Sequence, residues 1–569
     1  MRFARLSHMA RAIVALSALV MVTACSEDDP VAPQAPAAPT GLSAAANGPS
    51  GVRLTWTAVA NAQGYVLERA TGASGTFAQI ATPAAGTLTY DDNGLGANGT
   101  MYRYRLYARR GTLQSAASSE ATITLGVAGP TVRTVSGNIT ANQSWSADST
   151  YIVSGFVKVL APAKLTIAPG TRIVGKFDVP GSALFILQGA QIDARGTAAQ
   201  PIVFTSERAV GSRQPGDWGG LIIVGRGIIN RTGKVALEGT TATTADSVLI
   251  NGGTDNTDNS GILQYVRVEF AGYPVLQNAE LNSFTFAAVG SGTTMDHLQA
   301  MAGLDDSFEW FGGAVDSRYL VSYEAGDDHF DAAEGYKGRN QFLIAYQDTL
   351  LRARPGLLGG PSSDPQAFEI DGCNAGGCAQ GPASVPFNMP VFANFTLVGT
   401  GSATISGQNG GVGMVLRQGT GGTFINGIVA RFSGRAISVR NEFTDTLRMR
   451  DSLTLRNLLL AGNAANFDIA GPNFFGQADK FTNAAIEESA ATPSSLFVSL
   501  PAAGANPTSA AQLDWTPAAG SPAATGGLTT FPANIAARAG SFIVPTAYRG
   551  AADPGGAKWW AGWTVYVRR

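Results

Sequence analysis

The chain contains little cysteine, little histidine and little charge. Of its 569 residues, three are cysteine, three are histidine and 14% are charged. A net charge of -2, with no arginine-rich or lysine-rich run, argues against nucleic acid as a partner. A cysteine pair would need two further ligands to hold zinc, and the mature chain offers only His297 and His329, which are distant in sequence.

No apolar run is long enough to cross a bilayer, which takes about 20 residues as a helix. The longest near the N-terminus, "AIVALSALVMV", follows the basic residues Arg2, Arg5 and Arg11 and precedes the small-residue exit "VTAC". This order is typical of a secretory signal peptide, which we expect to span residues 1–24.

A signal that ends in small residues before a cysteine resembles a bacterial lipobox. The resemblance implies cleavage before Cys25 and acylation of that residue, so that Cys25 anchors the protein to a membrane. Ser26 and the acids of "SEDDP" imply, by the same resemblance, transfer to the bacterial outer membrane and exposure at the cell surface. The alternative is an ordinary secreted protein in which Cys25 has this position by chance.

The other two cysteines, Cys373 and Cys378, lie in the short loop "GCNAGGCAQG". In an oxidising compartment this spacing favours a local disulfide over a metal site.

The composition indicates an all-β protein, because 70 glycines accompany 45% hydrophobic residues and amphipathic helical patterns are almost absent. A proline-rich stalk is expected over 25–38. Residues 39–127 contain short alternating strands such as "VRLTWTAV" and "MYRYRLYAR". This segment resembles a fibronectin type III domain at Trp56, Tyr65, Leu95, Tyr102, Leu106 and Ala108. The resemblance implies a β-sandwich that acts as a spacer.

From residue 131 onward, related residues recur every 22 to 24 positions. Phe284, Phe308 and Phe330 follow this spacing, as do Tyr319 and Phe342. A period of this length fits one turn of a parallel β-helix and is about half of a propeller blade. We therefore expect a parallel β-helix over 131–500, followed by C-terminal coils over 501–569, whose Trp559, Trp560 and Trp563 form a cap over the last coil.

Three segments extend this interpretation: "LTIAPGTRIVG", "GDWGGLIIVGRG" and "YRGAADPGGAKWWAGWTVY". With the region around 261–347 they resemble a family of uncharacterised bacterial surface lipoproteins that fold as right-handed parallel β-helices. The resemblance implies the fold and names no activity.

Two acidic segments, "DDSFEWFGG" at 305–313 and "DDHFDAAEG" at 327–335, repeat one another at an offset of 22. If the phenylalanines point into the coil, Glu309 and Asp331 point outward from adjacent rungs about 4.8 Å apart. Two carboxylates at that distance repel by about 1 kcal/mol in water and about 3.5 kcal/mol at an effective dielectric of 20. Calcium is one ion that would compensate this repulsion, with six candidate ligands: Asp305, Asp306, Glu309, Asp327, Asp328 and Asp331.

Two alternatives to calcium stay open. Basic neighbours (Lys337, Arg318 and Arg339) would neutralise a solvated acidic stripe, or the aspartate pairs would cap turns by accepting backbone N–H groups. "FEIDGCNAGGCAQG" adds Glu369 and Asp371 in a loop expected to flank the same face.

For function, we expect binding or scaffolding at the cell envelope, with a glycan or a surface protein as partner. Trp310, Phe311 and Tyr336 are expected to be exposed beside the acids and, with Lys337 and Arg339, to bind this ligand. The alternative is a calcium-dependent polysaccharide lyase or glycoside hydrolase, which would use paired carboxylates. "NTD" at Asn256–Asp258 and "GDD" at Gly326–Asp328 lie about three rungs apart, and the Gly-His-Gly element typical of polygalacturonases is absent.

Overall fold

The computed structural model describes residues 34–48, 50–96, 99–126, 131–240, 247–276, 279–357, 362, 365–373, 376–401 and 411–566. The chain divides into two compact units, residues 1–129 and 130–569. The predicted signal peptide and Cys25 lie outside the described residues. Within the described ranges, no helix is long and apolar enough to cross a membrane.

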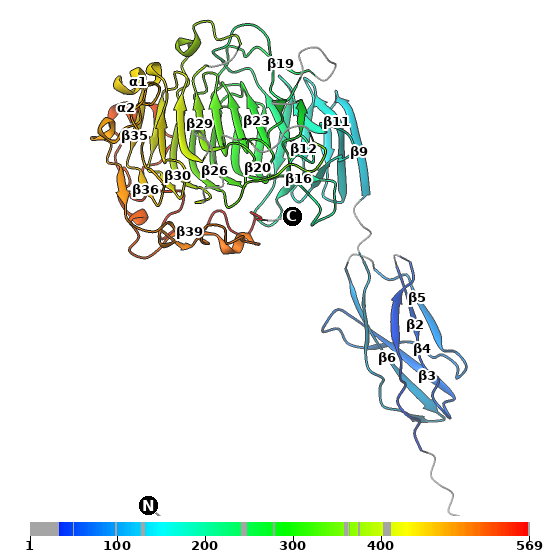
Figure 1. The fold of residues 1–569 in the computed structure, drawn as a ribbon. Coiled ribbons are helices and arrows are strands. Elements are labelled where there is room, and N and C mark those ends of the chain that lie inside the picture. The colour runs from blue at the N-terminus through cyan, green and yellow to red at the C-terminus, as the bar shows by residue number, and fades with distance from the viewer. Residues whose placement is uncertain are drawn as a thin grey trace, which may run out of the picture. The chain divides into compact units, whose positions relative to one another are not determined.

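The smaller unit is a β-sandwich of two antiparallel sheets (Figure 1). One sheet contains β1 (Ser43–Ala46), β2 (Gly51–Thr55) and β5 (Thr89–Asn93); the other contains β3 (Gly64–Thr71), β4 (Ala78–Ala81), β6 (Met101–Arg110), β7 (Leu113–Gln114) and β8 (Ala121–Thr124). Trp56, Tyr65, Tyr102 and Leu106 are at most 5% exposed, and together they form the core between the sheets. The alternation seen in the sequence therefore predicted the buried face of this unit.

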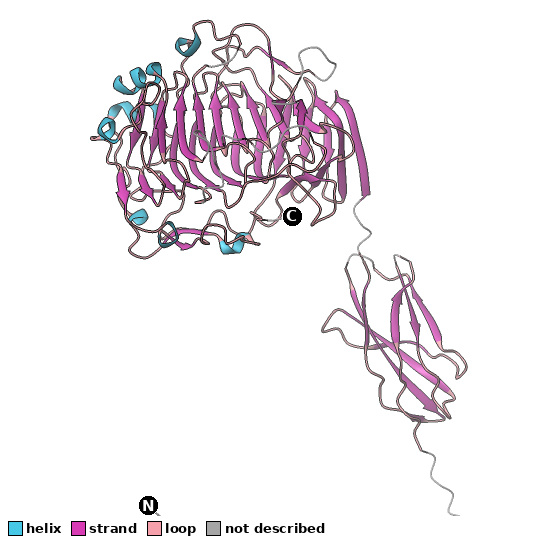
Figure 2. Ribbon diagram, in the orientation of Figure 1, coloured by secondary structure: helices cyan, strands magenta, loops and turns pink. Residues whose placement is uncertain are grey.

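The larger unit contains 25 strands joined in parallel ladders, and Figure 2 shows the few short helices outside them. The pairing register divides the stacked strands into three faces, here called A, B and C. Face A contains β14 (Ala183–Ile186), β17 (Leu221–Val224), β23 (Phe284–Ala287), β25 (Phe308–Phe311), β27 (Phe330–Ala333), β29 (Gln366–Asp371), β31 (Val412–Arg417) and β34 (Ile437–Val439).

Five long strands bend from face B into face C: β20 (Gly261–Glu269), β24 (Thr294–Met301), β26 (Asp316–Tyr323), β28 (Arg339–Tyr346) and β30 (Val391–Val398). Face B also holds β12 (Lys164–Ile167), β15 (Gln191–Arg195), β32 (Gly422–Ile425) and β35 (Leu453–Arg456). Face C also holds β13 (Arg172–Gly175), β16 (Ile202–Ser206), β33 (Ile428–Ala430), β36 (Leu459–Ala461) and β37 (Glu487–Ser489).

At the N-terminal end of the coil, β9 (Thr131–Ile139) and β11 (Ser149–Val159) pair in parallel as successive turns, and β10 (Gln143–Trp145) pairs with β12. The remaining elements are the antiparallel pairs β18 (Val235–Ala236) with β19 (Leu249–Ile250), β21 (Pro274–Leu276) with β22 (Ala279–Glu280), and β38 (Phe497–Ser499) with β39 (Asp514–Pro517), and two helices, α1 (Glu442–Met449) and α2 (Ala533–Ala539).

The core of the coil is built from side chains that repeat once per turn. Phe284, Phe308 and Phe330 are all 0% exposed and occupy equivalent positions in the ladder. Their ring centroids are 5.0 Å apart from the first to the second and 5.4 Å from the second to the third. Each fully buried phenylalanine contributes about 1.5–3 kcal/mol. The predicted parallel β-helix is confirmed, and the offset of 22 residues is one turn of it.

The bend between faces B and C is made by residues in the left-handed region of backbone space. Tyr265, His297, Tyr319 and Phe342 have φ values of 48°, 54°, 62° and 66°, and asparagines follow at 394, 426 and 457. Non-glycine residues with positive φ are uncommon, and here successive rings stack at 4.3, 4.4 and 5.2 Å. Stacking of these rings along the coil thus offsets the unfavourable free energy of the left-handed backbone conformation at the bend. At this corner Asp296 pairs with Arg318 and Leu298 with Leu320, so His297 and Tyr319, which lie between these pairs, stack on one another.

The C-terminal segment does not cap the last coil, so that expectation is wrong. Residues 496–566, here called the C-terminal strap, run back along the outside of faces B and C toward β20, as the orange and red segment in Figure 1 shows. The physical reason is that face C exposes apolar residues outward, among them Val321, Tyr323 and Ile344. Trp515, Trp560 and Trp563 of the strap, each at most 3% exposed, cover this surface.

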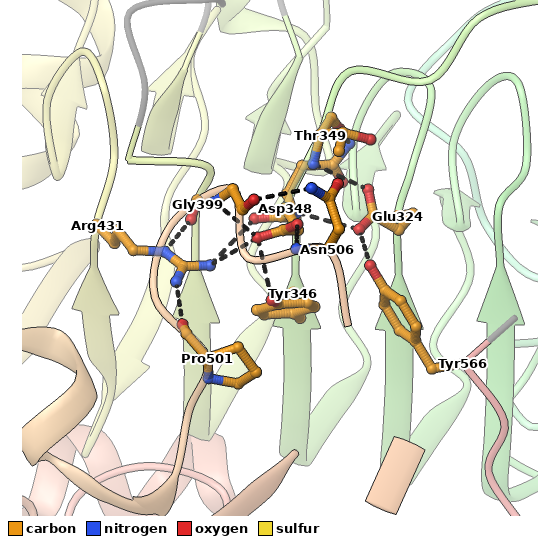
Figure 3. Close-up of polar contacts among 11 residues, drawn as sticks. Glu324, Tyr346, Asp348, Thr349, Gly399, Arg431, Pro501, Asn506 and Tyr566 are labelled. Carbon is orange, nitrogen blue, oxygen red and sulfur yellow. Dashed lines mark hydrogen bonds and ion pairs between the residues drawn. The ribbon is translucent and has the colours of Figure 1, made fainter. Parts of the chain in front are cut away.

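Buried polar contacts fasten the strap to the coil (Figure 3). Asp348 accepts the N–H groups of Gly504 and Asn506, both at 3.1 Å. Arg431 donates to the carbonyl oxygens of Gly399 at 2.7 Å and Pro501 at 2.8 Å. These groups lie between strap and coil, so their hydrogen bonds fix where the strap sits.

Candidate functional site

The outward side of face A carries a ladder of acids. Glu309, Asp331 and Glu369 occupy equivalent positions in β25, β27 and β29, and we call these three the carboxylate ladder. The pairing of Glu309 with Asp331 confirms the register expected from the repeat. Glu369 extends the ladder by a third rung that the 22-residue spacing did not reveal.

Loops cover the ladder and leave a pocket over it. The pocket has a volume of about 450 Å³, within the range of small-molecule sites. Its lining includes the ladder, Glu238 after strand β18, Phe311 of β25, Glu334, Asp371, Arg231 and Arg417. We call this the acidic pocket. The expectation that the outward acids face open water is wrong, because an apolar cluster around β18 and β19 packs beside them.

Burial raises the pKa of the acids in and beside this pocket. The pKa of Glu309 lies well above its usual value because of burial and then of the nearby Glu238 and Asp331. Burial and then Glu369 raise the pKa of Asp331 in the same way. Glu238 is exposed to solvent in the open pocket, and the protein atoms around its carboxyl group raise its pKa to about 7 by partly desolvating it. Because so many carboxylates lie together, they favour protons, cations or ligand hydroxyl groups.

Two arginines partly compensate the acids at the edges of the pocket. Arg417 donates to Asp371 Oδ1 at 2.8 Å and also to Glu369. Arg231 pairs with Glu334 Oε1, while Glu334 Oε2 has no hydrogen-bond partner among the described residues. The arginines therefore form ion pairs with the outer acids, while Asp331 at the centre of the ladder forms none in the described part of the chain and is attracted only from a distance by Arg417.

Two of the predicted metal ligands bind backbone groups of the next turn. Asp306 Oδ1 accepts the N–H of Asp328 at 2.8 Å, and Asp328 Oδ1 accepts the N–H of Gln366. The same pattern continues as Gln366 Oε1 accepts the N–H of Val412 at 3.2 Å. This geometry matches the capping alternative for Asp306 and Asp328, each of which keeps a second oxygen.

The six acids predicted to bind calcium, together with Glu369, form three groups. These are Asp305, Asp306 and Asp327; Asp306, Glu309 and Asp331; and Asp328, Asp331 and Glu369. Within each group, one oxygen per residue lies within 4.8 Å of the others. Asp331 Oδ1 is buried without a partner in the described part of the chain. Calcium takes six to eight oxygen ligands, so a group of this kind with water or ligand oxygens fits the ion.

Two of the aromatic residues predicted to contact a ligand belong to the core. Trp310 and Tyr336 are 0% exposed and stack on one another at 5.5 Å, so their expected exposure is wrong. The reason is that Trp310 shares the inward side with Phe308, and the Tyr336 hydroxyl donates to the Val315 carbonyl at 2.7 Å. Phe311 is 8% exposed and lines the acidic pocket.

The predicted basic ligand-binding residues lie away from the ladder. Lys337 is exposed, and Arg339 pairs with Asp316 on face B. Arg318 packs on the Phe542 ring at 4.2 Å. The proposed neutralisation of the acids by Lys337, Arg318 and Arg339 is therefore wrong. The predicted disulfide between Cys373 and Cys378 is confirmed.

Sequence reasoning missed Glu238, Glu334, Arg231 and Arg417. Glu238 and Arg231 come from the excursion between β17 and β20, which has no coil periodicity. Arg417 pairs in register with Asp371 across a long insertion. One signal in the sequence could have indicated Arg417: in "LRQ" at the end of β31 it follows the inward Leu416, so the alternation of the strand turns it outward.

The comparisons agree with this architecture. A family model described as a pectate-lyase like beta helix domain matches residues 137–499. The chain belongs to this family. All the residues that line the acidic pocket lie inside the matched region. A search of curated proteins gave no match.

The solved structures that match lie over the smaller unit. They include a Fn3-like protein from Clostridium thermocellum, 36% identical over 16% of this chain and 92% of that chain, with a TM-score of 0.15. FN3tt mut is 23% identical over 16% of this chain and 100% of its own, with a TM-score of 0.15. The twitchin kinase region from C. elegans is 20% identical, with a TM-score of 0.15; the match covers 16% of this chain and 17% of that one. The two antiparallel sheets of the smaller unit confirm the β-sandwich predicted for residues 39–127.

Proposed function

We propose that this protein is a lipid-anchored protein of the bacterial outer membrane that binds a saccharide in the acidic pocket. The observation that carries the proposal is the pocket itself, with a volume of about 450 Å³ above three stacked carboxylates. Carboxylates accept hydrogen bonds from sugar hydroxyl groups, and Arg231 and Arg417 supply donors. Phe311 adds an apolar wall on which a sugar ring can pack.

Calcium fits the proposal as an ion held by Asp306, Glu309 and Asp331. Two of these three, Glu309 and Asp331, line the pocket, so a cation between them would be within reach of a bound ligand. When bound, the ion would neutralise the ladder and would coordinate ligand oxygens. A surface protein that presents hydroxyl or amino groups is the alternative partner.

A calcium-dependent lyase or glycoside hydrolase is the second candidate. One observation favours it: Glu238, with a pKa raised to about 7, shares the pocket with Asp371, a carboxylate that accepts a hydrogen bond from Arg417. Acid–base cleavage of a glycosidic bond requires two carboxyl groups. One is an acid that keeps its proton near neutral pH, as Glu238 would, and the other is an ionised carboxylate, as Asp371 beside Arg417 would be. The pectate-lyase-like family membership supports this candidate in general terms.

The function is tested by a glycan array combined with assays for reducing ends and unsaturated products. We expect saccharide binding that falls at least about tenfold in Asp331→Asn, since a charge-assisted hydrogen bond contributes about 1.5–3 kcal/mol. Asp331→Asn should not unfold the protein, because it removes charge from a repulsive cluster. Asp178→Asn, at an exposed position paired with Lys176, is the matched control. Equal binding by both variants would contradict the proposal, and product formation lost in Glu238→Gln would decide for the enzyme.

The lipid anchor depends on Cys25, which follows the signal sequence. We expect Cys25→Ser to move the protein from the membrane fraction to the soluble fraction, since the acyl chains would be absent. Fractionation of cells that express each form measures this. Membrane retention of the serine variant would argue against lipid anchoring.

A further inference from the structure

A cluster of arginines lies on face C, separate from the acidic pocket on face A. Arg172 of β13 and Arg267 of β20 are outward residues of one column, because both pair in register with Val203 of β16. Arg213 comes from the segment after β16 and approaches the same acid as Arg267, Glu269. No arginine-rich run marks this cluster in the sequence, because the three residues are about 40 to 95 positions apart and come together only in the coil.

The single carboxylate in the cluster is already shared. Arg267 Nε donates to Glu269 Oε1 at 3.1 Å, and Arg213 lies 3.8 Å from Glu269 Oε2. A second nitrogen of Arg267 donates to the Trp563 carbonyl of the strap at 2.8 Å. Three guanidinium groups against one carboxylate leave a formal charge of +2 in a protein whose net charge is -2.

Arg172 is the arginine of the cluster that forms no ion pair within 4.0 Å in the described part of the chain, although Glu269 attracts it from a longer distance. Its guanidinium makes no side-chain hydrogen bond to the described part of the chain, although the residue is partly buried beside the other two. Burial and then repulsion from Arg213 lower the pKa of Arg172, and arginine remains charged nonetheless. Like charges held together in a partly buried site cost free energy unless an anion joins them.

A neighbouring group of charges is balanced. Asp217, whose side chain is 0% exposed, lies 3.4 Å from Arg208 and 3.7 Å from Arg354. Both of these guanidinium groups pack on the Phe177 ring, at 4.8 and 4.3 Å. Asp217 thus binds two arginines, while the adjacent Lys176 pairs with the two acids Asp178 and Glu207, so the excess of positive charge is confined to the cluster of Arg172, Arg213 and Arg267.

We propose that Arg172, Arg213 and Arg267 form a binding site for an oxyanion: a carboxylate, sulfate or phosphate group. Planar guanidinium groups bind such anions through paired N–H donors, and Arg172 has its donors available. The ligand class is an anionic group, such as the acidic substituent of a saccharide or an inorganic anion. This site is independent of the acidic pocket, which would repel the same ligand.

The test uses calorimetric titration of the full chain with sodium sulfate, sodium phosphate and sodium glucuronate, at an ionic strength held constant with chloride. We expect saturable binding that weakens at least about tenfold in Arg172→Gln. Arg195→Gln, at an outward arginine that is 59% exposed and paired with Asp193, should bind as the wild type does. Comparing the three anions distinguishes a sulfate or phosphate ligand from a carboxylate one.

Three results would overturn the proposal. These are no saturable binding beyond that of chloride, equal binding by the wild type and Arg172→Gln, and an equal loss in the Arg195 control. If Arg172→Gln does not fold, Arg172→Lys replaces it. The lysine variant keeps the charge and lacks the paired donors, so we expect weaker binding with a preserved salt dependence; binding equal to that of the wild type would count against the site.

Discussion

Replacing Arg417 with methionine is expected to destabilise the larger unit by about 3–5 kcal/mol at pH 7.5. Arg417 is the partner of both Glu369 and Asp371, and the three side chains are 20%, 14% and 10% exposed. Methionine fills a similar volume and removes the charge. Two acids would then stay buried beside Asp331 without a cation, which is the costly way to break a buried ion pair.

Denaturant unfolding at pH 7.5 and pH 5 measures this effect through the midpoint at an unchanged slope. The loss should be smaller at pH 5, because the abandoned carboxylates take up protons there. Arg195→Met, which breaks an exposed pair with Asp193, is the control and should cost at most about 1 kcal/mol. A loss below about 1 kcal/mol for Arg417→Met, or the same loss at both pH values, would contradict the role given to Arg417.

The coil and its register could be predicted because they depend on local, periodic burial. Phe308 and Phe330 must occupy the same inward position in successive turns, so their spacing gives the length of a turn and places Glu309 over Asp331. The same alternation also places Trp310 inside with Phe308, and the expectation of an exposed Trp310 departed from it. The alternation alone predicts a buried Trp310. The exposed position was expected only because acidic residues are its neighbours in the sequence.

The rest of the pocket could not be predicted, because insertions interrupt the period. Three pairs of pocket residues are in register on neighbouring rungs, but their spacing in the sequence differs. The spacing is 22 residues for Glu309 and Asp331, 38 for Asp331 and Glu369, and 46 for Asp371 and Arg417. Glu238 reaches the site from an excursion that belongs to no rung. Loop length carries no information about register, so spacing alone could not place these groups.

The position of the strap could also be predicted only in part. The apolar run in "RYLVSYEAG" reveals that both sides of this strand are covered, since Leu320 faces the core while Val321 and Tyr323 face outward. What covers them is a segment nearly 200 residues later, in which Trp515 donates to the Tyr323 hydroxyl at 2.9 Å. The apolar pattern of the strand predicts that another segment packs on its outer side. The three-dimensional structure is needed to identify that segment as the strap.

Calcium is expected to stabilise the chelated protein strongly. An ion that binds only the folded state contributes about 4 kcal/mol when its free concentration is a thousand times Kd. The groups that contain Asp331 supply its carboxylates, and Asp331 Oδ1 is buried without a partner among the residues described. The effect should be strongest above the raised pKa values of these acids, where the carboxylates are ionised.

The acids of the pocket make a contribution of definite sign to the pH dependence of the metal-free protein. The folded pKa values of Glu309, Asp331 and Glu238 are raised, so the folded protein keeps protons that the unfolded chain has released. The contribution of these acids to stability therefore falls as pH rises from the usual carboxyl range of about 4 toward the Glu238 pKa of about 7. The buried His329, whose pKa is lowered to about 3, contributes in the opposite direction and is outnumbered by the acids. Bound calcium would replace the protons and reduce this fall.

The most direct test of the acidic pocket as a cation and ligand site is the melting temperature of chelated protein at pH 5 and pH 7.5, with and without calcium. We predict a lower melting temperature at pH 7.5 than at pH 5 without calcium, and a rise with calcium that is larger at pH 7.5 and greatly reduced in Asp331→Asn. Magnesium at the same ionic strength is the control. No calcium-dependent shift in the wild type, or the same shift in Asp331→Asn, would contradict the account.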